Sequence, residues 1–313
     1  MSSNFLEEFG VENLESLPKP TSHNALIRFA QMLTEIESHF ERHVENFDGV
    51  IVYGDTDSTL AGAIWAKRKG FRVIHVESGL RSGNQVMPEE LNRILVDHIS
   101  DLHLAPSAAA MRNLEQEGLG DSARLVGDVM LDHLIQHEVS ENFFDFLHRN
   151  GVSEGHKYFV VSFHRNETVN SESKLSEIVE NINLASETTF VLGHPKLVEC
   201  LNRFGLRLSG KAKLLNPLSH RDLLSLIKLS SGVMTDSGGL QRESAVLGIP
   251  TLICREETEW LELLDLKNVL LSSNSFEWDK SLSKLPREIT PGINLGFAAE
   301  TSSRAIFEFL ERK

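Results

Sequence analysis

The sequence predicts an α/β protein built from two domains, each with a parallel sheet. Short apolar runs of strand length alternate with segments of helical composition along most of the chain. Such alternation is typical of parallel sheets that are covered by helices on both faces. A polar, loop-like stretch at 140–157 interrupts this rhythm. We therefore expect one Rossmann-like domain at 1–145, a second at 146–295, and a final helix at 296–313.

The expected elements follow one another in a regular order. Strands are expected where Val, Ile, Leu or Phe cluster, and helices where the intervening segments mix polar and apolar residues; Pro88 suits the first turn of one helix. In the first half we expect strands at 50–53, 71–75, 101–105 and, more weakly, 124–126, with helices at 57–69 and 88–98. In the second half we expect strands at 158–162, 189–192, 213–215, 232–235, 251–254 and 269–271, and a last helix at 295–310.

Length, charge and cysteine content limit the class of protein. A chain of 313 residues suggests about two domains. The formal net charge of −14 argues against nucleic acid as a partner, because phosphate backbones select basic surfaces. No apolar run approaches the ~20 residues that span a membrane, and the first residues lack the features of a signal peptide. Cys200 and Cys254 have no metal or redox spacing, so we expect a cytoplasmic protein with free thiols.

Polar residues follow the expected strands in both halves of the chain. In doubly wound sheets, ligands bind at the carboxyl ends of the strands. The repetition therefore predicts a site in a cleft between the two domains, with an anionic small molecule as a possible ligand. The residues at these strand ends are 54–58, Glu77, His164 with Arg165, His194 and 236–239.

The corner at 236–239 suits a phosphate group. Its two glycines, Gly238 and Gly239, permit close approach of a ligand, and the N-terminus of the following helix offers free N–H groups. The alternative is that Ser237 only caps that helix, as serine often does. Glu243 lies about one turn into the helix, where it would either accept hydrogen bonds from ribose hydroxyls or be a solvated acid.

Two other strand ends carry charged residues, although each has a simpler explanation. His164 and Arg165 suit a diphosphate leaving group, one as proton donor and the other as a charge clamp, but a His-Arg pair is more often an exposed loop. Asp55 follows the first strand at a corner that by itself favours a helix cap. His194 is a weaker candidate. Asp and His spacings do not suggest a metal site.

Acids and arginines crowd residues 75–93. This segment contains Glu77, Glu89, Glu90, Arg81 and Arg93. Carboxylates that are packed together have their pKa values pushed apart, so that one can act as a base while another holds a proton. Neighbouring arginines limit the cost of gathering the acids.

Taken together, these motifs resemble the bacterial and archaeal UDP-N-acetylglucosamine 2-epimerases. The matching stretches occur in family order at 54–56, 75–81, 88–93, 164–167, 236–243 and 258–262. The resemblance implies a two-domain, glycosyltransferase-B-like architecture with the nucleotide sugar in the cleft. It also implies a final helix that crosses back to the first domain, and a homodimer.

The resemblance also implies roles for the candidate residues. The family removes the proton on carbon 2 of the sugar and expels UDP to give 2-acetamidoglucal, then adds UDP back after reprotonation on the opposite face. No nicotinamide cofactor or metal is implied. The implied acid/base residues are Asp55, Glu77 and Glu89, with His164 assisting departure of UDP; the implied substrate-binding residues are Arg81, Arg165, His194, Ser237, Gly238, Gly239 and Glu243.

The sequence departs from the family pattern at several positions. Thr168 stands where asparagine is usual, Arg242 replaces a glutamate, and Trp260 with Leu261 replaces Arg-Pro. The first strand-helix-strand unit of the family, with its Gly-Thr-Arg-Pro-Glu loop, has no counterpart in the sequence. We therefore expect a shortened first domain, and a second polypeptide or a longer native form that supplies the unit.

Several functions remain open at this point. The leading hypothesis is interconversion of UDP-N-acetylglucosamine and UDP-N-acetylmannosamine. A hydrolysing epimerase would instead release N-acetylmannosamine and UDP. A catalytically incomplete protein that binds nucleotide sugars is a second class, and a glycosyltransferase of the same architecture is a third.

Overall fold

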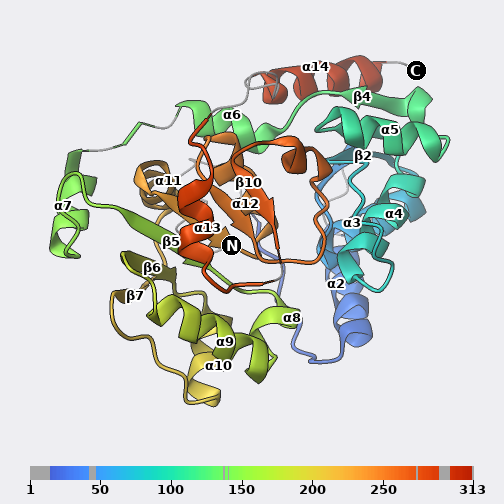
Figure 1. The fold of residues 1–313 in the computed structure, drawn as a ribbon. Coiled ribbons are helices and arrows are strands. Elements are labelled where there is room, and N and C mark those ends of the chain that lie inside the picture. The colour runs from blue at the N-terminus through green and yellow to red at the C-terminus, as the bar shows by residue number, and fades with distance from the viewer. Residues whose placement is uncertain are drawn as a thin grey trace. The chain divides into compact units, whose positions relative to one another are not determined.

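The fold consists of two α/β units, each organised around its own parallel sheet (Figure 1). The computed structural model describes residues 15–41, 47–136, 138–139, 141–272, 274–288 and 297–311. Among these, residues up to Asp132 and the last helix form the first domain, and 133–288 form the second domain. The predicted α/β class with two parallel-sheet domains is confirmed.

The first domain contains a four-stranded parallel sheet. Its strand order is β1-β2-β3-β4, so that each strand pairs with the next one along the chain. The strands are β1 (Gly49–Tyr53), β2 (Arg72–Val76), β3 (Leu102–Ala105) and β4 (Ala123–Leu125). The helices are α2 (Ala25–Phe40), α3 (Asp57–Arg68), α4 (Pro88–Ile99), α5 (Ala108–Gln116) and α14 (Ala298–Glu311), with a 3₁₀ turn at Gly120–Ser122. Helix α6 (Val129–Gln136) begins in the first domain and ends in the second.

Successive residues of β2 point to opposite faces of this sheet, as the period of a strand requires. Val73 joins one apolar cluster with residues of α2 and α3, whereas Ile74 joins another with residues of α14. The last helix is also tied to the first domain by polar contacts. Arg72 donates to the carbonyls of Phe309 and Leu310, each at 3.0 Å.

The second domain contains a six-stranded parallel sheet. Its strand order is β10-β9-β8-β5-β6-β7. From β5 the chain first adds β6 and β7 on one side and then β8, β9 and β10 on the other, which is the pattern of a doubly wound sheet. The strands are β5 (Tyr158–Ser162), β6 (Thr188–Leu192), β7 (Ala212–Leu215), β8 (Gly232–Thr235), β9 (Thr251–Ile253) and β10 (Val269–Leu271). The helices are α7 (Glu141–Arg149), α8 (Asn166–Val169), α9 (Glu172–Asn183), α10 (Pro195–Arg203), α11 (His220–Leu229), α12 (Gly238–Val246) and α13 (Trp278–Lys284), with a 3₁₀ turn at Leu261–Asp265.

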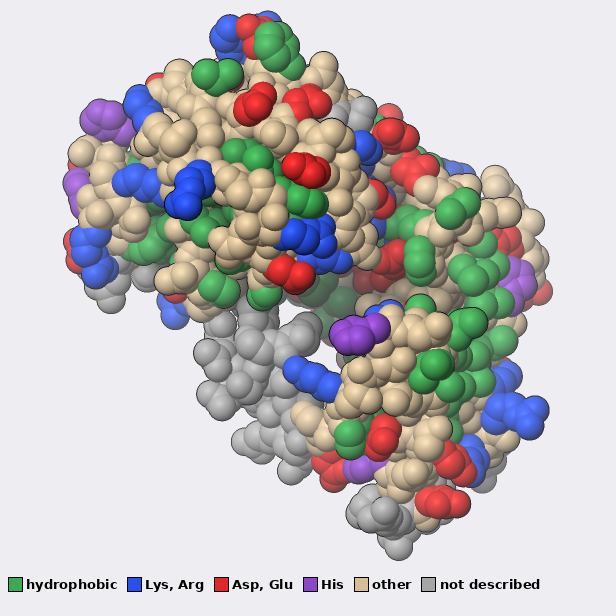
Figure 2. Space-filling view, turned by 90° about the horizontal axis from the view of Figure 1, so that it is seen from below, with side chains coloured by type: hydrophobic (Ala, Val, Ile, Leu, Met, Phe, Trp, Pro, Cys, Tyr) green, Lys and Arg blue, Asp and Glu red, His purple; other side chains and the backbone are tan. Residues whose placement is uncertain are grey.

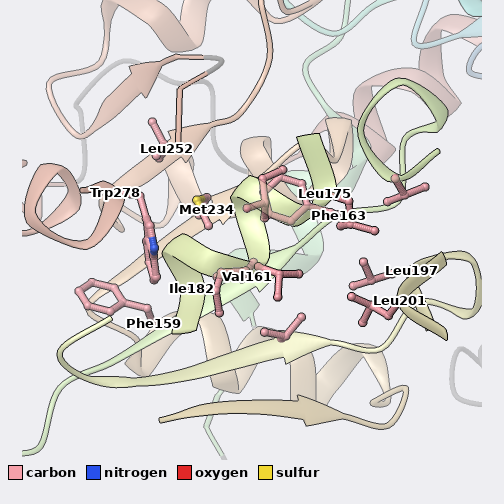
Figure 3. Packing of buried hydrophobic residues seen from close by; sticks show 14 of the residues in the cluster. Phe159, Val161, Phe163, Leu175, Ile182, Leu197, Leu201, Met234, Leu252 and Trp278 are labelled. Atoms are coloured by element: carbon pink, nitrogen blue, oxygen red, sulfur yellow. The ribbon is translucent and has the colours of Figure 1, made fainter. Parts of the chain in front are cut away.

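The core of the second domain lies between this sheet and its helices (Figure 3). Trp278 and Phe159 meet edge to face, with ring centroids 5.1 Å apart. The indole N–H of Trp278 donates to the Asn181 carbonyl at 3.2 Å, so the ring is buried without an unsatisfied polar group. This packing fixes α13 against the strands.

We predict that Trp278→Ala destabilises the second domain by about 3–5 kcal/mol, the usual cost of removing a large buried aromatic side chain. Urea unfolding followed by circular dichroism measures the change. Leu184→Ala is the matched control, because Leu184 is exposed. A loss for Trp278→Ala no larger than that for the control would contradict the packing described.

Candidate functional site

Asp55 lies in the turn that follows β1, and its side chain contacts a buried arginine. Arg93 of α4 is almost fully buried. It donates to Asp55 Oδ2 from Nε at 3.0 Å and from Nη2 at 2.7 Å. Asn92 donates to the Asp55 carbonyl at 2.9 Å. Both the side chain and the backbone of Asp55 are therefore positioned by α4.

Glu77 directly follows β2, in a backbone conformation that a residue with a side chain rarely adopts. Its φ is 71°, in the left-handed region. Such a conformation costs about 1–3 kcal/mol and persists only where the surroundings fix it. The Glu77 side chain is half-buried, and its Oε2 would lie 3.5 Å from a Cβ placed on Gly54. Glu77 and the Gly54–Asp55 turn are therefore neighbours.

The adjacent acids Glu89 and Glu90 have different surroundings, because successive helical residues point about 100° apart. Glu90 is buried, and it accepts hydrogen bonds from the Gly83 amide at 2.8 Å and from Arg93 Nη1 at 2.7 Å. Burial raises the pKa of Glu90, but these bonds, with the Ser82 amide and the charge of Arg93, lower it overall. Glu90 is therefore an ionised structural carboxylate, whereas Glu89 is half-buried and can meet a ligand.

Asp97, on the same helix, is the centre of a buried polar network. Its carboxylate accepts from His75 Nδ1 at 2.6 Å, from the Gly79 amide at 3.1 Å, from Arg81 Nη1 at 2.7 Å and from the Ser78 hydroxyl. Burial raises its pKa, but the hydrogen bonds and charges of these partners outweigh burial and hold the pKa well below its ordinary value. Asp97 is thus ionised in the interior of the domain.

Arg81, a predicted substrate-binding residue, directs its guanidinium toward groups of its own domain. Nε and Nη2 each donate to Glu117 at 2.8 Å, and Nη1 lies 2.7 Å from both the Leu80 carbonyl and Asp97. Burial lowers the pKa of Arg81, but the two carboxylates raise it overall. In this arrangement Arg81 positions Asp97.

In the second domain another buried aspartate organises the predicted His-Arg pair. Asp236 follows β8 and is fully buried. Its carboxylate accepts from the backbone amide of His164 at 3.0 Å and from that of Arg165 at 3.1 Å. Asp236 thus fixes the turn that follows β5, and the two side chains project from that turn.

His164 lies beside the other predicted histidine. The ring centroids of His164 and His194 are 5.2 Å apart. Burial lowers the pKa of His164; Asp236 raises it, and the nearby charges of His194 and Arg165 lower it further. A protonated His164 is therefore a stronger acid than an ordinary histidine. His194 also caps α10, because its Nδ1 accepts from the Lys196 amide at 3.3 Å.

Arg165 reaches toward the corner at the start of α12. Its Nη2 lies 3.5 Å from Glu259 Oε1, at the limit of a hydrogen bond, whereas Arg255 Nη1 donates to Glu259 Oε2 at 2.6 Å. Glu259 thus keeps a strong partner if Arg165 turns toward an anion. A Cβ on Gly238 would lie 2.6 Å from Glu259 Oε1, so a larger residue at this position would require the Glu259 side chain to move.

The other predicted residues of the corner have defined local roles. Ser237 is the N-cap of α12, and its hydroxyl accepts from the Leu240 amide at 3.4 Å. A Cβ on Gly239 would meet no atom within 4 Å, so the space beside it is open. Glu243 is buried on α12, with its Oε1 3.2 Å from His220 Nε2.

Two of the residues that depart from the family pattern touch each other. The guanidinium of Arg242 stacks on the ring of Trp260, with Cζ 4.1 Å from the ring centroid. Beside them, Thr258 donates to Gln241 Oε1 at 2.9 Å, which fixes the side-chain amide of Gln241. The two residues that depart from the family pattern therefore contact each other in this chain.

The part of the chain that the structure describes contains no group of three His, Cys, Asp or Glu side chains that could hold a metal ion. No helix in that part is long and apolar enough to cross a membrane. On the face drawn in Figure 2, acidic and basic side chains are interspersed.

Comparison with known proteins decides the family. The family described as UDP-N-acetylglucosamine 2-epimerase matches residues 1–307. The chain belongs to this family. A UDP-N-acetylglucosamine 2-epimerase of Methanococcus maripaludis is 36% identical over 260 residues, covering 79% of this chain and 70% of the relative. The UDP-2,3-diacetamido-2,3-dideoxy-D-glucuronate 2-epimerase of Pseudomonas aeruginosa is 33% identical over 331 aligned positions, covering 100% of this chain and 88% of the relative.

A solved structure agrees with this assignment. The UDP-GlcNAc 2-epimerase of Methanocaldococcus jannaschii, in complex with UDP-GlcNAc and UDP, superposes with a TM-score of 0.88 at 30% identity. The match covers 97% of this chain and 87% of that one. The resemblance inferred from the motifs is confirmed, and the chain is an enzyme of the UDP-sugar 2-epimerase type.

We predict that Asp97→Asn destabilises the first domain at pH 7 by about 3 kcal/mol or more, because it leaves buried cationic partners without their counter-charge. Since the pKa of Asp97 is lowered in the folded state, its stabilising effect is present above the unfolded pKa of about 3.9 and is lost as the pH falls toward the folded pKa.

Urea unfolding between pH 7 and pH 3 measures this effect. The difference between wild type and Asp97→Asn should shrink below about pH 4. Asp121→Asn is the matched control, because Asp121 is exposed. A difference that grew on acidification would refute the assignment of an ionised Asp97.

Proposed function

We propose that this protein interconverts UDP-N-acetylglucosamine and UDP-N-acetylmannosamine. The observations that carry the proposal are that Asp55 and Glu77 are neighbours after β1 and β2, and that Glu89 lies in the first turn of α4, the helix that binds Asp55, within a chain of the epimerase family. The sugar carbon that inverts bears a weakly acidic proton. Its removal on one face and replacement on the other require more than one acid/base group.

The reaction begins by breaking the bond between carbon 2 and its proton. A carboxylate of the first domain accepts that proton, the electron pair forms the carbon 1–carbon 2 double bond, and the bond from carbon 1 to the UDP oxygen breaks. The intermediates are 2-acetamidoglucal and UDP. Return of a proton to the opposite face of carbon 2, with addition of UDP to carbon 1, gives the epimer and balances the reaction.

The second domain would hold UDP and receive its developing negative charge. Arg165 supplies a cation whose present contact with Glu259 is long and easily exchanged. His164 supplies a proton to the departing diphosphate, and its lowered pKa favours transfer to that oxygen. Ser237, Gly238 and Gly239 offer the amide groups at the start of α12, and Glu243 is proposed to accept from the ribose hydroxyls. His194 lies beside His164 and would join it at the diphosphate.

A substrate with a sugar carboxylate is a second candidate. The match to the glucuronate epimerase of Pseudomonas aeruginosa covers the whole chain, and this sequence carries an arginine at 242 where the family has a glutamate. Because Arg242 is buried against Trp260, the match over the whole chain is the stronger support for this candidate. Both UDP sugars therefore belong in the same assay.

We infer that the protein forms a homodimer and works in the cytoplasm. Leu91 and Leu95 lie one turn apart on α4 and are 53% and 40% exposed, a pairing that suits a protein interface. Cys200 and Cys254 are free thiols, as in a reducing compartment. Light scattering of the purified chain tests the dimer; a monomeric mass at all concentrations would refute it.

The reaction itself is tested by incubating the chain with UDP-N-acetylglucosamine in deuterated water and following carbon 2 by NMR. We expect deuterium at carbon 2 and the appearance of UDP-N-acetylmannosamine. Release of free N-acetylmannosamine with UDP would identify a hydrolysing epimerase. UDP binding by calorimetry with no exchange would instead favour a binding protein, and transfer to an acceptor a glycosyltransferase.

We predict that Glu77→Gln and Glu89→Gln each slow carbon 2 exchange by about a hundredfold or more, the usual contribution of a general acid or base. UDP affinity should stay within about twofold, because the nucleotide is proposed to bind the second domain. Glu115→Gln is the matched control on α5 of the same domain. If either variant lost UDP affinity while exchange persisted, the roles assigned to the two acids would be wrong.

A further inference from the structure

Two turns of the first domain place acidic residues through unusual backbone conformations. Gly54, directly before Asp55, has φ 67°, and Glu77 has φ 71°. The first is easy for glycine, but the second is strained for glutamate. The amide of Gly54 donates to the Val76 carbonyl at 3.1 Å, so the two turns are joined. Something must hold both turns in place.

The His75 ring lies between these turns and is fully buried. Its Nδ1 is 2.6 Å from Asp97 Oδ1, and its Nε2 is 2.8 Å from the Gly54 carbonyl oxygen. A backbone carbonyl only accepts hydrogen bonds, and an ionised carboxylate also only accepts. Each ring nitrogen therefore needs a hydrogen to satisfy its partner, and only the imidazolium carries two.

The charges around His75 are consistent with a protonated ring. Glu117, Arg81, Asp97 and His75 follow one another through contacts of 2.8, 2.7 and 2.6 Å. With His75 protonated, negative and positive charges alternate and balance along this chain. With His75 neutral, one ring nitrogen would face an acceptor oxygen without a hydrogen between them, which is costly for a buried pair.

The neighbouring histidine has different partners. His103 pairs with His75 across β2 and β3, and it is also fully buried. Its Nε2 is 2.7 Å from the Asp97 carbonyl oxygen, but its Nδ1 is 3.0 Å from the Ser122 hydroxyl. A hydroxyl can donate as well as accept. The Ser122 hydroxyl also lies 3.1 Å from the Leu119 carbonyl oxygen, and if its hydrogen turns to His103 Nδ1 instead, both nitrogens of a neutral His103 ring have partners. These contacts of His103 do not include either acid-bearing turn.

We infer that His75 is a buried imidazolium that positions the two turns carrying Asp55 and Glu77. The effect of His75 on the reaction rate rests on the proposed epimerase chemistry, whereas its positioning role does not. One N–H orients the Gly54 peptide, from which Asp55 continues. The other binds Asp97, which also holds the backbone just after Glu77 through Ser78 and Gly79. His75 touches no substrate in this scheme and is a positioning residue.

The direct test is NMR of the intact, ¹³C,¹⁵N-labelled chain at pH 8, with the His75 ring assigned through bonds from its own Cβ. An ordinary histidine, with a pKa of about 6.5, is neutral there. We expect both ring nitrogens of His75 to carry a hydrogen, whereas only one ring nitrogen of His103 should carry one. A single hydrogen on the His75 ring at pH 8 would overturn the inference, and this reading needs neither a variant nor activity.

Two variants test the positioning role. In His75→Gln, the backbone amide resonances of Asp55 and Glu77 should shift, whereas in the matched control His103→Gln they should stay in place. Carbon 2 exchange should fall by about a hundredfold in His75→Gln, the scale for a misplaced catalytic group, with UDP affinity unchanged. Exchange in His103→Gln should remain within about twofold of wild type.

The outcomes separate this inference from the proposed reaction. If wild type exchanges no proton at carbon 2, the proposed function fails, while the ring hydrogens and amide shifts still decide the role of His75. Unshifted Asp55 and Glu77 amides in His75→Gln, or equal shifts in both variants, would refute positioning. If His75→Gln does not fold, Asp97→Glu, which keeps the carboxylate but displaces it, should move the same amides.

Discussion

The ionised carboxylate of Asp97 is the constraint on which the first domain depends. It is fully buried, and a charge in that position is stable only if several donors surround it. Those donors come from the turn after β2 and from His75 on β2 itself. Satisfying one buried charge therefore fixes the backbone on both sides of Glu77. The strained conformation of Glu77 is a consequence of that requirement.

The second domain solves the same problem with Asp236. This aspartate is also fully buried, and it accepts from the backbone amides of His164 and Arg165. In both domains, a carboxylate that lies inside the protein orients a turn whose side chains face outward. The arrangement separates two tasks: buried aspartates set the backbone, and half-buried residues such as Glu77, Glu89 and Arg165 remain for chemistry.

The sequence predicts the fold well, because buried parallel strands leave a strong apolar signal. The strands at 158–162, 232–235 and 269–271 have the observed bounds, and the others differ by about one residue. Motif resemblance gave the family. Side-chain direction was not predictable, as Arg81 illustrates: its motif suggests a ligand for substrate, but Glu117, far along the chain, takes two of its nitrogens.

Helix α4 explains why the buried position of Asp97 escaped sequence reasoning, although Arg93 was noted among the acids. Apolar residues at helical spacing normally mark the buried face. Here Leu91 and Leu95 are on the exposed side, whereas Glu90, Arg93 and Asp97 point inward. The spacing of 90, 93 and 97 does place the three on one face. Only their partners on other segments, such as Asp55 and His75, show that this polar face is the buried one.

Buried charge, and not regular secondary structure, holds the turns that carry the acids. Amide hydrogen exchange of the intact chain at pH 7 tests it most directly. Gly79 lies outside the helices and strands, but its amide donates to Asp97. We predict that the Gly79 amide exchanges as slowly as those in the centre of β2. Exchange as fast as in exposed turns such as Gly70 would contradict the account.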